Sequence, residues 1–178
     1  MRKFDHNGLL LATYQAEIFE KSTELKCSSP IFLRRFLHSD YLKLLDKNES
    51  MCFALDPFEG IEMITEQYGD SAYGKIKYSK DSLFWMGYMY RYISYTREEP
   101  TSFIMKTFDY RLMNDVYYSF HTQDPEWVIA SLLDIKHLDE DYLDKNKRLK
   151  KILKRRYEND PEFQKIMAVV NKENNSRK

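Results

Sequence analysis

Three observations predict an all-α fold for this chain of 178 residues. The stretch 79–97 carries apolar and aromatic side chains in every direction around a helical period, and a helix that is apolar all round is buried. Other segments show apolar residues at helical spacing behind a helix-start pair such as Asp124-Pro125. Five Gly and five Pro are also few for an all-β protein with many turns. We therefore expect a single compact helical domain around a buried aromatic helix, followed by a basic helical extension at the C-terminus.

The helices on either side of the aromatic helix follow from the same signals. Ser29-Pro30 and Asp56-Pro57 place a capping residue before a proline at the first helical position. Before the aromatic helix, we expect helices over 8–26, 30–38, 40–45 and 57–67, then an extended link over 73–78. The apolar run 51–55 fits either a strand or a helix. After the aromatic helix, we expect helices over 101–108, 110–119, 125–133, 140–158 and 160–170, with 171–178 frayed.

Within the aromatic helix, Ser79 is the expected N-cap, and Asp81 lies in the first turn, where negative charge suits the free backbone N–H groups. Gly87 in the middle costs roughly 1 kcal/mol relative to alanine. We expect the close approach of another helix to compensate for this glycine. Buried tyrosine hydroxyls need partners, so the core should contain a network of hydrogen bonds.

Charge divides the chain into an acidic body and a basic tail. Residues 1–146 contain 17 Lys and Arg against 24 Asp and Glu, whereas residues 147–178 contain 11 against 4. We expect a helical core domain over 1–138 and a charged helical extension over 139–178. The body and the tail either attract each other within one molecule, or the tail binds an acidic partner.

Residue usage argues against several classes of protein and site. Cys27 and Cys52 are isolated thiols, which predicts a reducing, cytoplasmic setting without disulfides or a zinc site. The four histidines are scattered and the common catalytic motifs are absent, so we predict no metal, no cofactor and no catalytic residue. The N-terminus lacks a signal-peptide core, and no segment approaches a membrane span of about 20 mostly apolar residues. Nothing in the sequence indicates an oligomeric state.

One candidate pocket is centred on Arg91, the single charge in the middle of the aromatic helix. An arginine among aromatic rings is either a site residue or a structural charge paired with a carboxylate at the core edge, and we favour the structural role. His121 and Asp124 lie in a polar loop that either joins the pocket or starts the next helix, and we favour the helix start. The candidate pocket residues are Arg91, Tyr88, Tyr95, His121 and Asp124.

The strongest electrostatic signal is a run of cations in the tail. It comprises Lys147, Arg148, Lys150, Lys151, Lys154, Arg155 and Arg156. Such a run contacts nucleic-acid phosphates or an acidic protein, or it is the solvated face of an amphipathic helix. This helix has an apolar seam, which favours a helix that contacts protein over a bare DNA-binding arm. The seam consists of Tyr142, Leu149, Ile152, Leu153 and Tyr157.

Two blocks of residues form recognisable motifs, and a weaker third block covers 31–40. The aromatic block reads Leu83-Phe84-Trp85-Met86-Gly87-Tyr88-Met89-Tyr90-Arg91-Tyr92, and the second block reads His121-Thr122-Gln123-Asp124-Pro125-Glu126. Together they resemble a family of small, tyrosine-rich bacterial helical proteins with the cores Leu-Tyr-Trp-Ile-Gly-Tyr-x-Tyr-Arg-Tyr-Trp and His-Thr-x-Asp-Pro-Glu. The resemblance spans 30–134. Phe84 and Ile93 replace the family's tyrosine and tryptophan, so a site that depends on that hydroxyl or indole is not carried over.

Members of this family are encoded in toxin–antitoxin-like loci beside ADP-ribosyltransferase-like toxins, so the resemblance implies an antitoxin or partner protein. We therefore expect a non-enzymatic interaction protein that is the antitoxin or regulatory partner of a toxin-like protein. One alternative is a nucleic-acid-binding regulator or phage-defence accessory that uses the basic helix. A second alternative is an enzyme with a pocket formed by Arg91, Tyr88 and His121. The expected partner is a toxin-like protein, with nucleic acid as the alternative partner and no membrane association.

Overall fold

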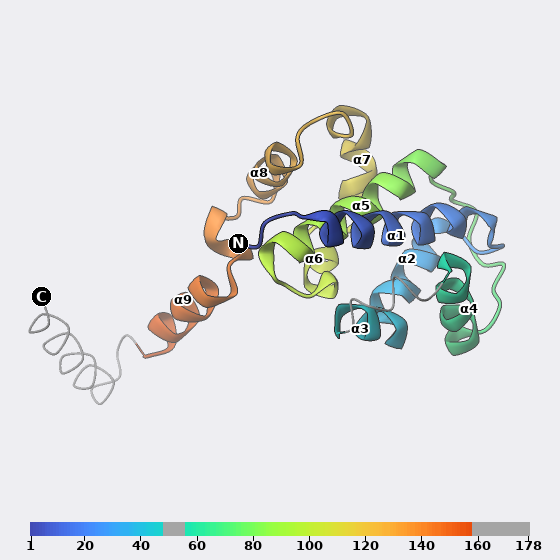
Figure 1. Ribbon diagram of the computed structural model, residues 1–178, viewed down its shortest axis with the longest axis horizontal. Coiled ribbons are helices and arrows are strands. Elements are labelled where there is room, and N and C mark those ends of the chain that lie inside the picture. The colour runs from blue at the N-terminus through green and yellow to red at the C-terminus, as the bar shows by residue number, and fades with distance from the viewer. Residues whose placement is uncertain (48–55, 158–178) are drawn as a thin grey trace, which may run out of the picture. The chain divides into compact units, whose positions relative to one another are not determined.

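The computed structural model describes residues 1–47 and 56–157, and within these ranges the chain forms helices and no strand (Figure 1). The predicted all-α fold is confirmed. The α-helices are α1 (His6–Lys21), α2 (Ser29–His38), α3 (Asp40–Lys47), α4 (Pro57–Tyr68), α5 (Lys80–Arg97), α6 (Thr101–Thr107), α7 (Tyr110–Phe120), α8 (Pro125–Ile135) and α9 (Lys145–Tyr157). Two short 3₁₀ helices, η1 (Ser22–Glu24) and η3 (Glu140–Leu143), follow α1 and precede α9. The expectations for 51–55, including Cys52, and for 158–178 lie outside the described residues.

Helix α5 is the central element, as predicted for 79–97. Ser79 caps its N-terminus by accepting a backbone N–H hydrogen bond from the first turn at 3.1 Å. Twelve of the 18 residues of α5 are buried, and they include both apolar and polar side chains. Glu98 ends the helix in the left-handed conformation, with φ of 53°. The all-round apolarity of the sequence therefore reflects burial on several sides.

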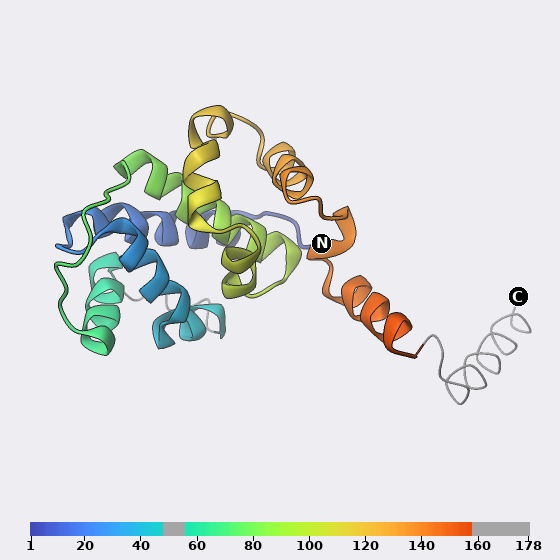
Figure 2. The same ribbon diagram turned by 180° about the vertical axis from the view of Figure 1, so that it is seen from behind.

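Helix α1 packs along α5, and both views show the two helices side by side (Figures 1 and 2). At their contact, Gly87 lies against the backbone of α1, so that a Cβ at this position would be 2.7 Å from the carbonyl oxygen of Gln15. The Gln15 side chain in turn donates from Nε2 to the carbonyl oxygen of Gly87 at 3.1 Å. The predicted close approach at Gly87 is confirmed, and the approaching helix is α1.

The first helix begins and ends earlier than the expected range 8–26. Asp5 is its N-cap, because the Asp5 carboxylate accepts the backbone N–H of Gly8 at 3.0 Å. The α-helix ends at Lys21, where the chain tightens into η1. The expected extended link is also present, and it runs beside the start of α2, where Ser28 donates its backbone N–H to the carbonyl oxygen of Tyr73 at 3.0 Å.

The remaining helices of the first unit lie on two sides of the α1–α5 pair. Figures 1 and 2 show α2, α3 and α4 grouped on one side and α7 and α8 on another. Between α1 and α2 the core is aromatic, because Phe19 meets Phe36 edge to face with ring centroids 4.8 Å apart. The fully buried Tyr90 of α5 donates its hydroxyl to the carbonyl oxygen of Phe108 at 2.7 Å. Tyr90 therefore has the hydrogen-bond partner that a buried phenol was expected to need.

By packing, the chain divides into two compact units, Met1–His137 and Leu138–Lys178. The division into a core domain over 1–138 and a charged extension over 139–178 stays a prediction. In the second unit, the expectation of one continuous helix over 140–158 is wrong, because the chain breaks at Asp144 between η3 and α9. The Asp144 backbone is extended, and its carboxylate accepts the backbone N–H of Lys147 at 3.0 Å. A new helix therefore starts there with its own capping carboxylate.

Candidate functional site

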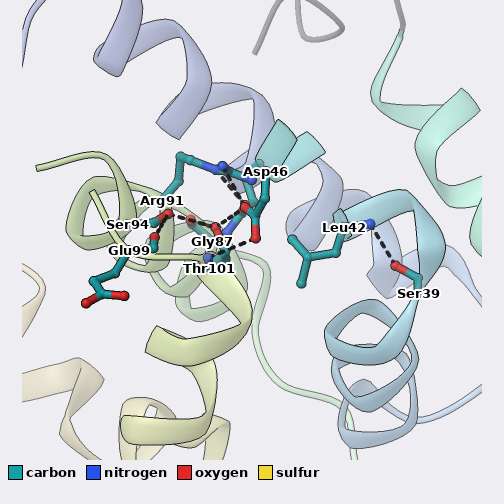
Figure 3. A network of polar contacts seen from close by, with 9 residues as sticks. Ser39, Leu42, Asp46, Gly87, Arg91, Ser94, Glu99 and Thr101 are labelled. Carbon is teal, nitrogen blue, oxygen red and sulfur yellow. Dashed lines mark hydrogen bonds and ion pairs between the residues drawn. The ribbon is translucent and has the colours of Figure 1, made fainter. Parts of the chain in front are cut away.

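Arg91 lies in a buried polar cluster contributed by α1, α3, α5 and α6 (Figure 3). Arg91 is only 4% exposed. Its Nε donates to Oε1 of Gln15 on α1 at 3.0 Å, and its Nη1 donates to Oδ1 of Asp46 on α3 at 3.0 Å. The structure therefore pairs Arg91 with a carboxylate at the edge of the core, which is the structural role that the sequence favoured.

The carboxylate of Asp46 also starts α6. Its Oδ2 accepts the backbone N–H of Thr101 at 3.0 Å, and its Oδ1 lies 2.7 Å from the Thr101 hydroxyl oxygen. Pro100 occupies the N-cap position of α6 and has no polar side chain, so a carboxylate from another helix serves as the cap. The Nη2 atom of Arg91 is buried and makes no hydrogen bond within the described residues. Asp46 thus links α3, α5 and α6.

Tyr95 and Asp124 serve local structure instead of a shared pocket. Tyr95 donates its hydroxyl to Oδ1 of Asp5 at 2.6 Å, and this bond holds the pKa of the Asp5 carboxyl below its usual value. The guanidinium of Arg2 lies 3.7 Å above the Tyr95 ring. Asp124 accepts two backbone N–H groups from the first turn of α8, at 2.9 and 3.4 Å. The expected helix start at Asp124 is confirmed.

Tyr88 and His121 do come together, at a pocket of about 480 Å³ in the first unit. The apolar lining consists of Phe84, Trp85, Tyr88, Met89, Tyr117 and Pro125. The polar lining consists of Glu20, Asp81, His121 and Gln123. Arg91 is not part of this lining, because its side chain turns toward α1 and α3. The structure therefore does not assemble the site that an enzyme using Arg91, Tyr88 and His121 would need.

Aromatic contacts shape the side of the pocket formed by α7. The rings of Trp85 and Tyr117 meet edge to face at 5.8 Å, and the ring of His121 lies 4.7 Å from that of Tyr117. The Nδ1 atom of His121 is 3.0 Å from the carbonyl oxygen of Tyr117, one helical turn earlier. Burial raises the pKa of the Tyr88 phenol, and burial together with the charge of Asp81 raises the pKa of the Tyr117 phenol. Both phenols are therefore neutral at neutral pH.

The sequence interpretation missed several residues of this pocket. Trp85 lies three residues before Tyr88, and Tyr117 lies four residues before His121, so each shares a helix face with a residue that was chosen. The spacing of three and four residues was therefore the signal that could have added Trp85 and Tyr117 to the candidate pocket. Glu20 carried no such signal, because it comes from α1, which meets α5 only through tertiary packing.

In the second unit, several cations of α9 already have local partners. Lys147 pairs with Asp141 at 2.7 Å, and Lys151 pairs with Asp139 at 2.8 Å. Arg148 donates from Nη1 to the carbonyl oxygen of residue 142 at 2.9 Å. Lys150 is exposed. The other three cations of the run, Lys154, Arg155 and Arg156, lie at the end of α9, where the description covers the backbone alone.

Helix α9 also exposes apolar side chains between its cations. Leu149, Ile152 and Leu153 are 44%, 52% and 48% exposed. Their spacing of three and four residues places them on one face of the helix. We call these three residues the α9 apolar face.

Comparisons with known protein families, with curated proteins and with solved structures found no match. Within residues 1–47 and 56–157, no group of three or more His, Cys, Asp or Glu side chains is placed to hold a metal ion. None of the described helices combines the length and the apolar character needed to cross a lipid bilayer.

Proposed function

We propose that this protein is a non-enzymatic interaction protein whose helix α9 binds an acidic protein partner. The partner proposed from the sequence resemblance is a toxin-like protein, which this chain would neutralise or regulate as an antitoxin. The observation that carries the proposal is the α9 apolar face, which is about half exposed within a helix rich in Lys and Arg. Burial of the exposed half of one of these side chains at an interface contributes on the order of 1 kcal/mol to binding.

Charge supports a partner with an acidic surface. The residues from 147 onward contain 11 Lys and Arg against 4 Asp and Glu. A partner groove with an apolar floor and acidic edges would complement both properties of α9. This is the common arrangement in which an amphipathic helix places its apolar face in a groove, with charges at the edges selecting the partner.

The α9 apolar face favours a protein partner over nucleic acid. Duplex binding depends on cations that are available to neutralise phosphates. Lys147 and Lys151 are already paired with Asp141 and Asp139, so a phosphate and an acidic protein surface would face the same competition for them. Apolar residues contribute little to phosphate contact, whereas they dominate the centre of a protein interface. Nucleic-acid binding through the basic run is therefore the second candidate.

The test is co-expression of the full chain with the product of the adjacent gene, followed by co-purification and a growth assay. We expect a complex and relief of growth inhibition. The triple variant Leu149→Gln, Ile152→Gln and Leu153→Gln keeps good helix formers and should weaken the complex by at least about tenfold. The control is Ile76→Gln, which removes an apolar side chain that is 62% exposed in the first unit.

A second measurement separates the two candidate partners. Binding of a short DNA duplex is measured at about 50 and 200 mM salt with the wild type, the triple variant and Lys150→Glu. Tight, salt-dependent duplex binding that survives in the triple variant and falls in Lys150→Glu would favour the nucleic-acid alternative. Absence of both a complex and growth rescue would contradict the antitoxin proposal.

A further inference from the structure

The pocket beside Tyr88 combines aromatic surface with negative charge. Phe84, Trp85 and Tyr88 of α5 face it together with Tyr117 of α7. Its volume of about 480 Å³ lies in the range of pockets that bind small molecules, roughly 300–1,000 Å³. The buried Met89, which is 2% exposed, also lines it. The pocket lining therefore includes aromatic side chains from two different helices.

The charged groups in the lining are acidic. Glu20 comes from the end of α1 and Asp81 from the first turn of α5, and none of the lysines and arginines in 1–47 and 56–157 lines the pocket. Neither carboxylate forms an ion pair with any described residue. The neighbouring Lys21 is directed elsewhere, because its ammonium lies 3.7 Å above the ring of Phe58. Two carboxylates thus line an aromatic pocket, and no lysine or arginine among the described residues lines it with them.

This combination selects a class of ligand. An anion would be repelled by the two carboxylates, and a purely apolar ligand would have to displace water from them without compensation. A metal ion would require more ligands than these, and no sufficient group is present within the described residues. An organic cation satisfies both features, because it is attracted to the faces of tryptophan and tyrosine rings and neutralises the carboxylates.

We propose that this pocket binds a small organic cation, an ammonium or guanidinium group, between Trp85 and Tyr88, with Glu20 and Asp81 as its counter-charges. The pocket lies in the first unit, and this proposal does not depend on the partner of α9. The cation could be a free metabolite or the side chain of a lysine or arginine on another protein. The recognition chemistry is the same for both sources.

The chain contains two tryptophans, which permits a direct test. The variant Trp127→Phe removes the half-exposed tryptophan at the edge of Phe120 and leaves Trp85 in the pocket as the fluorescent reporter. In this background, Trp85 fluorescence is titrated with choline and with butylguanidinium at constant ionic strength. The neutral isostere 3,3-dimethyl-1-butanol is the control ligand. We expect saturable binding of a cation that is about tenfold tighter than binding of the neutral compound.

Charge removal tests the counter-charges. The double variant Glu20→Gln and Asp81→Asn should weaken cation binding by about tenfold and leave binding of the neutral isostere within about twofold. The matched control is Glu24→Gln with Asp115→Asn, which removes two exposed carboxylates that do not line the pocket. Folding of each variant is checked by far-UV circular dichroism. The single variant Asp81→Asn, at an exposed position, replaces the double variant if the latter does not fold.

The relative affinities of these probes identify the source of the cation and test the proposal itself. Stronger binding of N-acetyl-lysine amide or N-acetyl-arginine amide than of choline would support the proposal and identify a protein side chain as the source. Stronger binding of choline would support it and identify a free metabolite. Equal affinity for the cation and its neutral isostere would overturn the proposal. Unchanged affinity in the charge-removal variants, or the absence of saturable binding by any of these probes, would overturn it as well.

Discussion

Replacing Gly87 by alanine tests the contact around which the first unit is built. Alanine usually stabilises an exposed helix interior by about 1 kcal/mol relative to glycine. Here the added Cβ would lie 2.7 Å from the carbonyl oxygen of Gln15, and 2.8 Å from Cα of Ala16. Both atoms belong to the backbone of α1, so neither can move aside by rotating a side chain. The two helices must separate by several tenths of an ångström.

The structure predicts that this separation outweighs the gain in helix propensity. Overpacking a core costs about 1–3 kcal/mol, and contact with backbone on the opposing helix places Gly87→Ala near the upper end. Separation also lengthens the buried hydrogen bond from Gln15 Nε2 to the Gly87 carbonyl oxygen, which is worth about 1 kcal/mol. We expect the free energy of unfolding to fall by about 2–3 kcal/mol. With a denaturant slope of about 2 kcal/mol per molar, the urea midpoint should fall by roughly 1 M.

Urea unfolding followed by circular dichroism and by tryptophan fluorescence measures this change. The control Ser119→Ala changes helix propensity at an exposed position of α7 and should stabilise the protein slightly. Adding Ala16→Gly to Gly87→Ala should not restore stability, because the clash is with backbone atoms. A Gly87→Ala variant that is as stable as the wild type, or more stable, would refute the close contact of α1 and α5.

Two further predictions concern the buried polar groups of α5. Arg91→Met should lower the free energy of unfolding by about 3 kcal/mol, because it leaves the Asp46 carboxylate without its cation. Adding Asp46→Asn to this variant should recover at least about 1 kcal/mol of that loss. Strictly additive losses, measured by urea unfolding, would argue against an energetic coupling of Arg91 and Asp46. Burial, with the adjacent Glu126 carboxylate, raises the pKa of Tyr92 to about 12, and burial raises the pKa of Tyr90 as well. Above about pH 10 these phenols ionise in the unfolded chain while the folded protein keeps their protons, so stability should fall as pH rises from 10 toward 12. Urea midpoints measured from pH 8 to 11 should decline more gently in Tyr92→Phe, and a flat wild-type profile would contradict the raised pKa values.

The helix boundaries that depend on neighbouring residues were predictable. Ser79 and Asp124 each cap the helix that the sequence assigned to them, because a capping side chain bonds to backbone groups within the next turn. The same local chemistry was overlooked at Asp144, where a cap interrupts the expected helix 140–158. Asp5 was missed for the same reason at the start of α1. These errors concern helix ends, and the presence of a helix in each of these regions was predicted correctly.

The candidate pocket was predictable only in part. Tyr88 and His121 were chosen individually, and the structure places both at one pocket. Arg91 lies three residues from Tyr88 on the same helix, yet its guanidinium turns toward Asp46 and Gln15. No sequence pattern within α5 distinguishes a side chain that lines the pocket from one that turns toward α1 and α3. The direction of Arg91 depends on where α1 and α3 place their polar side chains.

By itself, the sequence determined the all-α class, the central position of 79–97 and the need for a close neighbour at Gly87. These features depend on periodicity, capping and glycine content, which act over one or two helical turns. Only the tertiary structure decided which helix approaches Gly87, which carboxylate neutralises Arg91 and which residues line the pocket with Tyr88. Those pairings join helices that are distant in the chain, and they follow from the packing of whole helix faces against one another.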